Sequence, residues 1–141
     1  MMVSTKGRYA LRTMIDLAQH ADGSSISLSD IAKRQQISVK YLEAVISTLN
    51  KGGLVISKMG KKGGYRLAKE PKDYTIGEIL KLTEGNLAPV ACLKEENSCE
   101  RAGMCMTLPM WQEVKNLITD YFEQITLEDL LNGNVKRDRE R

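Results

Sequence analysis

The fold of this chain is decided by residues 27–68, which read SLSDIAKRQQISVKYLEAVISTLNKGGLVISKMGKKGGYRLA. Ser27 and Ser38 each precede a run of apolar residues at helical spacing, and serine is a preferred residue at a helix N-cap. We therefore expect two short helices joined by a turn at residues 35–37, the second ending near Asn50. Its buried side is predicted to carry Tyr41, Leu42, Val45, Ile46 and Leu49.

A β-hairpin is predicted to follow the helix pair. Residues 54–58 and 65–68 are rich in apolar, β-branched and aromatic side chains, which favour strands. Between them, residues 59–64 contain three glycines, which tolerate the backbone conformations of a tight turn. Two helices followed by a glycine-tipped hairpin are typical of a winged helix-turn-helix. We predict a mainly α fold with this small β-hairpin wing and a long C-terminal dimerisation helix.

Positive charge is concentrated in the same part of the chain. Residues 31–69 contain nine basic residues and one acid, Glu43, for a net charge of +8, whereas the whole chain carries +3. The basic residues are Lys33, Arg34, Lys40, Lys51, Lys58, Lys61, Lys62, Arg66 and Lys69. Basic residues on one helix and one hairpin tip indicate a nucleic-acid binder. The alternative is a solvated basic face on an ordinary helical domain.

Length and composition are those of one globular domain with an appended helix. The chain has 141 residues, of which 42% are hydrophobic and 28% charged. No apolar run approaches the roughly 20 residues of a membrane span, and residues 1–9 lack the apolar centre of a signal peptide. We expect a cytoplasmic protein without a membrane partner. The sequence contains no catalytic constellation, and we expect no enzymatic activity.

Helices are also predicted outside the central stretch. Ser4 caps a helix that extends to about residue 21, Thr75 with Glu78 forms a capping box for a helix to about residue 84, and a long helix occupies residues 107–123. The long helix carries an apolar stripe made of Met110, Trp111, Val114, Leu117, Ile118, Tyr121 and Phe122. This stripe is either intramolecular core or a dimer seam. We favour the seam, because helix-turn-helix proteins usually bind two half-sites as dimers.

All three cysteines lie in one segment without clear periodicity, residues 87–106. They are Cys92, Cys99 and Cys105, with six and then five residues between them. This spacing differs from zinc ribbons and redox dithiol motifs. Three thiolates without a fourth ligand nearby fit an iron–sulfur site or a transition-metal site, including zinc or Cu(I). The alternative is a loop with three unligated thiols.

Several motifs together resemble the IscR/CymR-type winged-helix regulators. They are Ser4-Thr5-Lys6-Gly7-Arg8-Tyr9-Ala10, Ile31-Ala32, Ser38 through Tyr41-Leu42-Glu43, Gly53-Leu54-Val55, and Gly60 through Gly63-Gly64-Tyr65. The resemblance covers about residues 2–131, and the three-cysteine segment resembles the IscR-like, cluster-binding branch. It implies a dimeric repressor or activator in which the state of the cluster controls DNA binding.

The resemblance also implies a set of site residues. Ser38, Lys40, Tyr41 and Glu43 would lie on the recognition helix, where Glu43 could accept a hydrogen bond from a cytosine amino group. The wing, with Lys58, Lys61, Lys62 and Gly63, would enter the minor groove of double-stranded DNA. Cys92, Cys99 and Cys105 would bind an iron–sulfur cluster of [2Fe–2S] type.

The sequence departs from the family pattern at several positions. Met59 replaces the usual wing arginine, so the neighbouring lysines must supply the positive charge. Leu108 stands where IscR-type proteins have a histidine ligand, and Arg8 stands where some relatives provide an acid from the partner subunit. The first cysteine interval is one residue longer than the common pattern. The identity of the fourth ligand is therefore open.

These observations predict four regions along the chain. Residues 1–85 form the winged helix-turn-helix, 86–106 the cluster segment, 107–131 the dimerisation helix with a short terminal helix, and 132–141 a flexible tail. The predicted function is a homodimeric transcriptional regulator that senses iron–sulfur, redox or nitric-oxide status. The alternative is a cysteine-metabolism-type repressor, controlled by a partner metabolic enzyme and by thiol oxidation, without a cluster.

Overall fold

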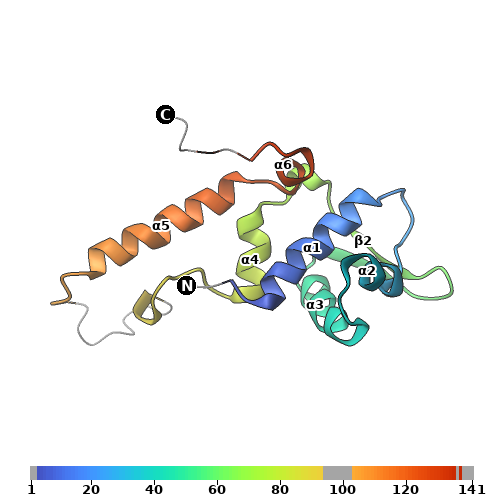
Figure 1. The fold of residues 1–141 in the computed structure, drawn as a ribbon, viewed down its shortest axis with the longest axis horizontal. Coiled ribbons are helices and arrows are strands. Elements are labelled where there is room, and N and C mark those ends of the chain that lie inside the picture. The colour runs from blue at the N-terminus through green and yellow to red at the C-terminus, as the bar shows by residue number, and fades with distance from the viewer. Residues whose placement is uncertain (1–2, 94–102, 136, 138–141) are drawn as a thin grey trace.

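A computed structural model describes residues 3–93, 103–135 and 137 of the chain. Its elements in chain order are α1 (Thr5–Gln19), α2 (Leu28–Gln35), α3 (Val39–Lys51), β1 (Val55–Lys58), β2 (Gly64–Leu67), the 3-10 turn η1 (Pro71–Asp73), α4 (Ile76–Glu84), the 3-10 turn η2 (Ala91–Leu93), α5 (Leu108–Gln124) and α6 (Leu127–Asn132). The predicted mainly α fold with a two-stranded wing is confirmed (Figure 1). Figure 1 also shows α5 extending away from the other helices.

Local capping accounts for where the helices begin. The hydroxyls of Ser4, Ser27 and Ser38 accept hydrogen bonds from the backbone N–H three residues further on, as predicted. Thr75 caps α4 in the same way, but the predicted reciprocal partner, Glu78, has its carboxylate paired with Lys69 at 3.2 Å. A complete capping box forms instead at α6, between Thr126 and Asp129.

The core lies between α1, α3 and α4. The apolar face of α3 buries Leu42, Val45, Ile46 and Leu49, in agreement with the periodicity. Tyr41 was predicted on the same buried side, and this prediction is wrong because its side chain is 39% exposed. It stands on the edge of the buried stripe, where its ring contacts α1 and still faces solvent.

The wing is an antiparallel hairpin in which Val55 pairs with Leu67 and Lys58 with Gly64. A third backbone segment joins it, because Ile26 and Tyr65 exchange two hydrogen bonds of 2.8 Å. A Cβ at Gly64 would lie 2.2 Å from the carbonyl oxygen of Ile26, so only glycine allows this close approach. The loop before α2 is thereby attached to the base of the wing.

The start of α4 is connected to both the wing and the C-terminal region. The hydroxyl of Tyr74, a fully buried residue, donates to the carbonyl of Leu54 at 2.6 Å and accepts from the N–H groups of Ala68 and Lys69 at 2.9 Å. On its other side, Ile76 N–H donates to Ile125 at 2.8 Å and Leu127 N–H donates to Tyr74 at 3.0 Å. The segment that follows α5 is therefore held on the start of α4.

Some predictions fall outside the described residues. Cys99 and residues 94–102 of the cysteine segment are among them, as are residues 136 and 138–141 of the predicted tail at 132–141. Across the described part of the chain, no helix combines the length and the apolar character that a membrane crossing would need.

Candidate nucleic-acid interface

The exposed side of α3 carries the residues predicted to contact bases. Ser38, Lys40, Tyr41 and Glu43 are all exposed in the described structure. Ser38 also caps the helix, because its hydroxyl accepts from Tyr41 N–H at 3.2 Å. The N-terminal half of α3 therefore presents an amine, a phenol and a carboxylate to solvent, and these groups include both donors and acceptors for DNA base edges.

Tyr41 is held against α1 by an aromatic contact. Its ring meets that of Tyr9 edge to face, with centroids 5.3 Å apart and an interplanar angle of 88°. The guanidinium of Arg12 lies 5.2 Å from the centroid of the Tyr9 ring. Both contacts are of kinds that attract through the ring quadrupole. Tyr41 is thus an exposed residue whose position is restricted by its neighbours on α1.

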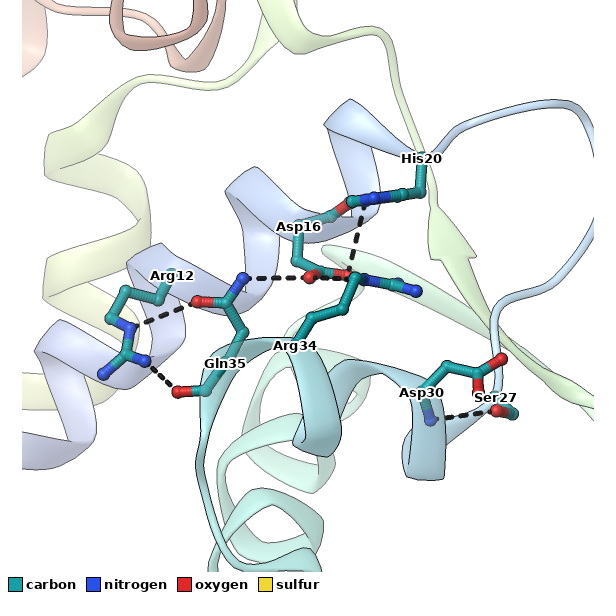
Figure 2. Close-up of polar contacts among 7 residues, drawn as sticks. All are labelled: Arg12, Asp16, His20, Ser27, Asp30, Arg34 and Gln35. Atoms are coloured by element: carbon teal, nitrogen blue, oxygen red, sulfur yellow. Dashed lines mark hydrogen bonds and ion pairs between the residues drawn. The ribbon is translucent and has the colours of Figure 1, made fainter.

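A buried carboxylate, Asp16, fixes α2 against α1 (Figure 2). It accepts from Arg34 Nη2 at 2.7 Å, from Arg34 Nε at 3.0 Å and from Gln35 Nε2 at 2.9 Å. Gln35 is held from its other side as well, because Arg12 Nε donates to Gln35 Oε1 at 3.2 Å and Arg12 Nη2 donates to the Gln35 carbonyl. Since Gln35 ends α2, this network fixes the turn that leads to α3.

Hydrogen bonding keeps Asp16 ionised despite its burial. Burial alone would raise the pKa of this carboxyl, but the hydrogen bonds from Arg34 and Gln35 outweigh burial and lower the pKa below its ordinary value. The carboxylate in turn raises the pKa of Arg34. A buried, paired charge of this kind is strongly destabilising to break, because the remaining partner loses its counter-charge.

The sequence analysis did not identify Asp16, Arg12, Gln35 or Tyr9 as important to the interface. One signal was available for Asp16. It is an acid within the buried arc of α1, whose fully buried neighbours include Thr13, Met14 and Leu17. An acid in such an arc requires a cationic partner, although the sequence does not indicate which one.

The tip of the wing is thin and exposed. Lys58, Lys61 and Lys62 are exposed, and the loop closes through a 2.9 Å hydrogen bond from Gly63 N–H to the Gly60 carbonyl. Met59, which replaces the usual arginine, is 92% exposed. Figure 1 shows the β1–β2 loop projecting beyond the helices. Such a tip leaves its ammonium groups open to solvent, as contact with the phosphates of a duplex would require.

Two of the nine basic residues in the 31–69 stretch pair with acids of the same chain. Arg34 pairs with Asp16 at 2.7 Å and Lys69 pairs with Glu78 at 3.2 Å. Among the described residues, the other seven make no ion pair and are exposed: Lys33, Lys40, Lys51, Lys58, Lys61, Lys62 and Arg66. The positive field available to DNA is therefore smaller than the sequence count of +8 indicates, and it remains on α2, α3 and the wing.

The two described cysteines lie next to α5. Cys92 is in η2 and Cys105 precedes α5, and both are partly exposed. Leu108 N–H donates to the Cys105 carbonyl at 3.3 Å, and Lys115 Nζ on α5 lies 3.4 Å from the carbonyl of Leu93. Both cysteine-bearing ends thus contact α5. Within the ranges that the structure describes, no three His, Cys, Asp or Glu side chains converge as metal ligands.

The two positions at which the sequence lacks a family ligand carry other structural roles. Leu108 is the first residue of α5, and its aliphatic side chain has no donor atom. Arg8 is exposed on α1, where its guanidinium donates to the Thr5 hydroxyl at 3.3 Å. The thiols themselves are soft donors, which fit an iron–sulfur cluster.

Comparison with known proteins decides the family. A sequence profile named Rrf2 and described as an iron-dependent transcriptional regulator matches residues 3–133. The chain belongs to the Rrf2 family. A helix-turn-helix-type transcriptional regulator from Haemophilus influenzae is 39% identical over 142 aligned positions, covering all of this chain and 94% of the relative.

Two solved Rrf2-type structures share the fold over nearly their whole length. CymR, the global cysteine regulator of B. subtilis, superposes with a TM-score of 0.75 at 36% identity, covering 92% of this chain and 95% of CymR. IscR of T. potens superposes with a TM-score of 0.74 at 37% identity, covering 100% and 92%. This Rrf2 protein is a DNA-binding transcriptional regulator, similar to IscR and CymR to nearly the same degree.

Proposed function

We propose that this Rrf2 protein works as a homodimer whose DNA binding is controlled by an iron–sulfur cluster on Cys92, Cys99 and Cys105. The observation that carries the proposal is the position of α5. It is in contact with both described ends of the cysteine segment, and it has no buried residue in the described structure. A helix with these two properties would be suited to connect a sensing segment to a partner subunit.

The exposed side of α5 supports the dimer. Met110, Leu117 and Tyr121 are 51%, 60% and 38% exposed. Their spacing of seven and four residues places them on one face of the helix. A second copy of the same face would cover these side chains, and a twofold axis there would present two recognition helices to two half-sites.

The donor chemistry supports the cluster. Cys92, Cys99 and Cys105 would hold it, with the fourth ligand still to be identified. A bound cluster would supply a centre that reacts with oxidants or nitric oxide and that exchanges with the cellular iron–sulfur supply. The hydrogen bonds from Leu108 N–H to the Cys105 carbonyl and from Lys115 Nζ to the Leu93 carbonyl would then transmit a change at the thiols to α5.

Anaerobic purification of the full chain tests the cluster. We expect a coloured protein with visible absorbance and bound iron and sulfide. The single changes Cys92→Ser, Cys99→Ser and Cys105→Ser should remove the absorbance. Met106→Leu is the matched control, because Met106 is 94% exposed beside Cys105 and its change should leave the spectrum intact. A colourless protein without iron or sulfide after reconstitution would exclude the cluster.

A second candidate function is supported by the similarity to CymR, which is nearly the same as that to IscR. In this version the cysteines are thiol switches and a metabolic enzyme docks on the C-terminal region. The protein would then be colourless, its DNA affinity would change with oxidant, and cysteine-synthesis enzymes would bind it in a pull-down. Metal-free protein with oxidant-insensitive DNA binding would contradict this alternative.

A further inference from the structure

Glu123, near the C-terminal end of α5, makes a specific polar contact with α4. Its carboxylate accepts from Lys81 Nζ at 2.8 Å and from the Thr75 hydroxyl at 3.1 Å. The hydrogen bond from Lys81 is the main reason that the pKa of Glu123 is lowered, against the opposing effect of partial burial. One carboxylate thus connects α5 to the N-cap of α4 and to a lysine further along that helix.

A missing side chain on α4 makes room for this carboxylate. A Cβ at Gly77 would lie 2.5 Å from Glu123 Oε1 and 2.9 Å from its Cδ, so any larger residue would displace it. Gly77 lies in the first turn of α4, where glycine is less favourable than alanine. The positive-φ glycines of the described chain do not include Gly77. The glycine is therefore explained by the close approach of Glu123.

Helix α4 is also in close contact with the end of the recognition helix. A Cβ at Gly52, the C-cap of α3, would lie 2.4 Å from Leu82 Cδ2. The start of α4 is also connected to the wing, through the hydroxyl of Tyr74. In Figure 1, α4 lies between α5 and the helix-turn-helix unit. A change in how α5 rests on α4 is therefore a change relative to the recognition helix and the wing.

We propose that Glu123 is a positioning residue that sets the angle of α5 over α4, and thereby the distance between the two recognition helices of the dimer. This inference rests on the proposed dimer. The ion pair is largely exposed, with 48% and 39% side-chain exposure, so its direct contribution to folding stability is small. The proposed effect comes from its location near one end of α5, where a small change in angle moves the far end of the helix by several ångströms.

The length of α5 gives the expected size of the effect. A helix of 17 residues is about 25 Å long. A tilt of about 10° at one end moves the other end by about 4 Å. Because base pairs are stacked about 3.4 Å apart, such a movement is about the rise of one base pair, the smallest step by which the half-site spacing can change.

The test is a spacing assay with the full-length protein. Duplexes selected from a random library by the wild type are rebuilt with one base pair added or removed between the half-sites. We expect the wild type to prefer its own spacing by about tenfold. Gly77→Ala should shift the optimum by one base pair or reduce the preference to less than about threefold, with affinity for a single half-site unchanged. Glu123→Gln and Lys81→Met should change the preference in the same direction.

Two comparisons separate positioning from general damage. Asp120→Asn removes another exposed acid from α5 and should leave the spacing preference unchanged. Gly77→Ala combined with Glu123→Ala removes the steric conflict, and it should be thermally more stable than Glu123→Ala alone because alanine favours the helix. Equal changes in single-site affinity and in spacing preference would indicate general damage and would overturn the positioning role.

Failure of the inference is distinguishable from failure of the proposed function. If the wild type sediments as a monomer on DNA, or shows no spacing preference, the dimer proposal fails. If the wild type is a dimer with a clear preference, and Gly77→Ala and Glu123→Gln keep that preference unchanged, Glu123 has no positioning role. Should Gly77→Ala fail to fold, Glu123→Gln gives the same decision.

Discussion

Two helices of similar length, α1 and α5, have different surroundings in this protein. The 15 residues of α1 include six buried ones, whereas none of the 17 residues of α5 is buried in the described structure. Both helices have an apolar stripe at helical spacing. The difference teaches that an apolar stripe predicts that one face of a helix is buried, but does not identify the element that buries it. The cover of α1 is α2, α3 and α4 of the same chain. On α5, Ile118 and Phe122 pack against the core of the same chain, whereas we propose a second copy as the cover of the exposed part of the stripe.

The largest effect is expected where α1 is most buried. Asp16→Asn removes the carboxylate that holds Arg34 and Gln35, and it should lower the free energy of unfolding by about 3 kcal/mol, because a buried charge pair loses one partner. Denaturant titration measures this loss. Glu113→Gln, on the exposed side of α5, is the matched control and should change stability by less than about 0.5 kcal/mol. A change at Asp16 no larger than in the control would contradict the importance of this network.

The stability difference between the wild type and Asp16→Asn should depend on pH. Because the pKa of Asp16 is lowered in the folded state, its stabilising contribution is present above the pKa of the unfolded chain and is lost as the pH falls through the folded-state pKa. The stability difference between the wild type and Asp16→Asn should be full above about pH 5 and should shrink steadily below about pH 4. A difference that stays constant down to about pH 2 would assign the loss to packing and not to charge.

A change on α5 is expected to have an intermediate effect, which falls on subunit association and not on folding stability. Leu117→Asp introduces a charge on the exposed stripe and should convert the dimer to a monomer in sedimentation experiments, while the helical circular dichroism is retained. Ile79→Ala on α4, where the side chain is fully buried, should instead leave the dimer intact and lower the free energy of unfolding by about 2 kcal/mol, because it leaves a cavity in the core. A Leu117→Asp protein that remains dimeric would place the subunit contact elsewhere.

The smallest effect on stability is expected at the wing. Lys61→Ala with Lys62→Ala should leave the free energy of unfolding within about 0.5 kcal/mol of the wild type. The dependence of log K on log salt for DNA binding should become shallower by up to about 2, roughly one for each phosphate that a lysine no longer neutralises. Arg34→Met, at a paired arginine, should lower stability and leave this slope unchanged. An unchanged slope in the double alanine variant would show that these lysines do not contact phosphate.

The elements of the fold were predictable because they depend on nearby residues. Ser27 and Ser38 cap helices through bonds spanning three residues. The wing strands differ from the prediction by one residue at the start of each strand and at the end of β2. The exposure of Ser38, Lys40 and Glu43 on α3 also agrees with their helical positions. Tyr41 was assigned to the wrong side because it lies at the edge of the stripe, where periodicity does not separate buried from exposed.

The contacts that position these elements were not predictable. Asp16 and Arg34 are 18 residues apart, and Lys81 and Glu123 are 42 residues apart. The sequence shows an acid in a buried arc and a glycine inside a helix, but neither pattern names its partner. The DNA-contacting roles of the α3 and wing residues, and the ligand roles of the cysteines, remain predictions.

By itself, the sequence determined the order of the helices and the wing, the caps at which they begin, and the concentration of positive charge on the helix pair and hairpin. These features follow from residue type and from interactions within a few residues, which need no contact between distant parts of the chain. Only the tertiary structure decided that Asp16 pairs with Arg34, that the ring of Tyr41 packs against that of Tyr9, and that the Glu123 carboxylate lies against Gly77. Such contacts join residues distant along the chain, and their geometry exists only once the core has brought the helices together.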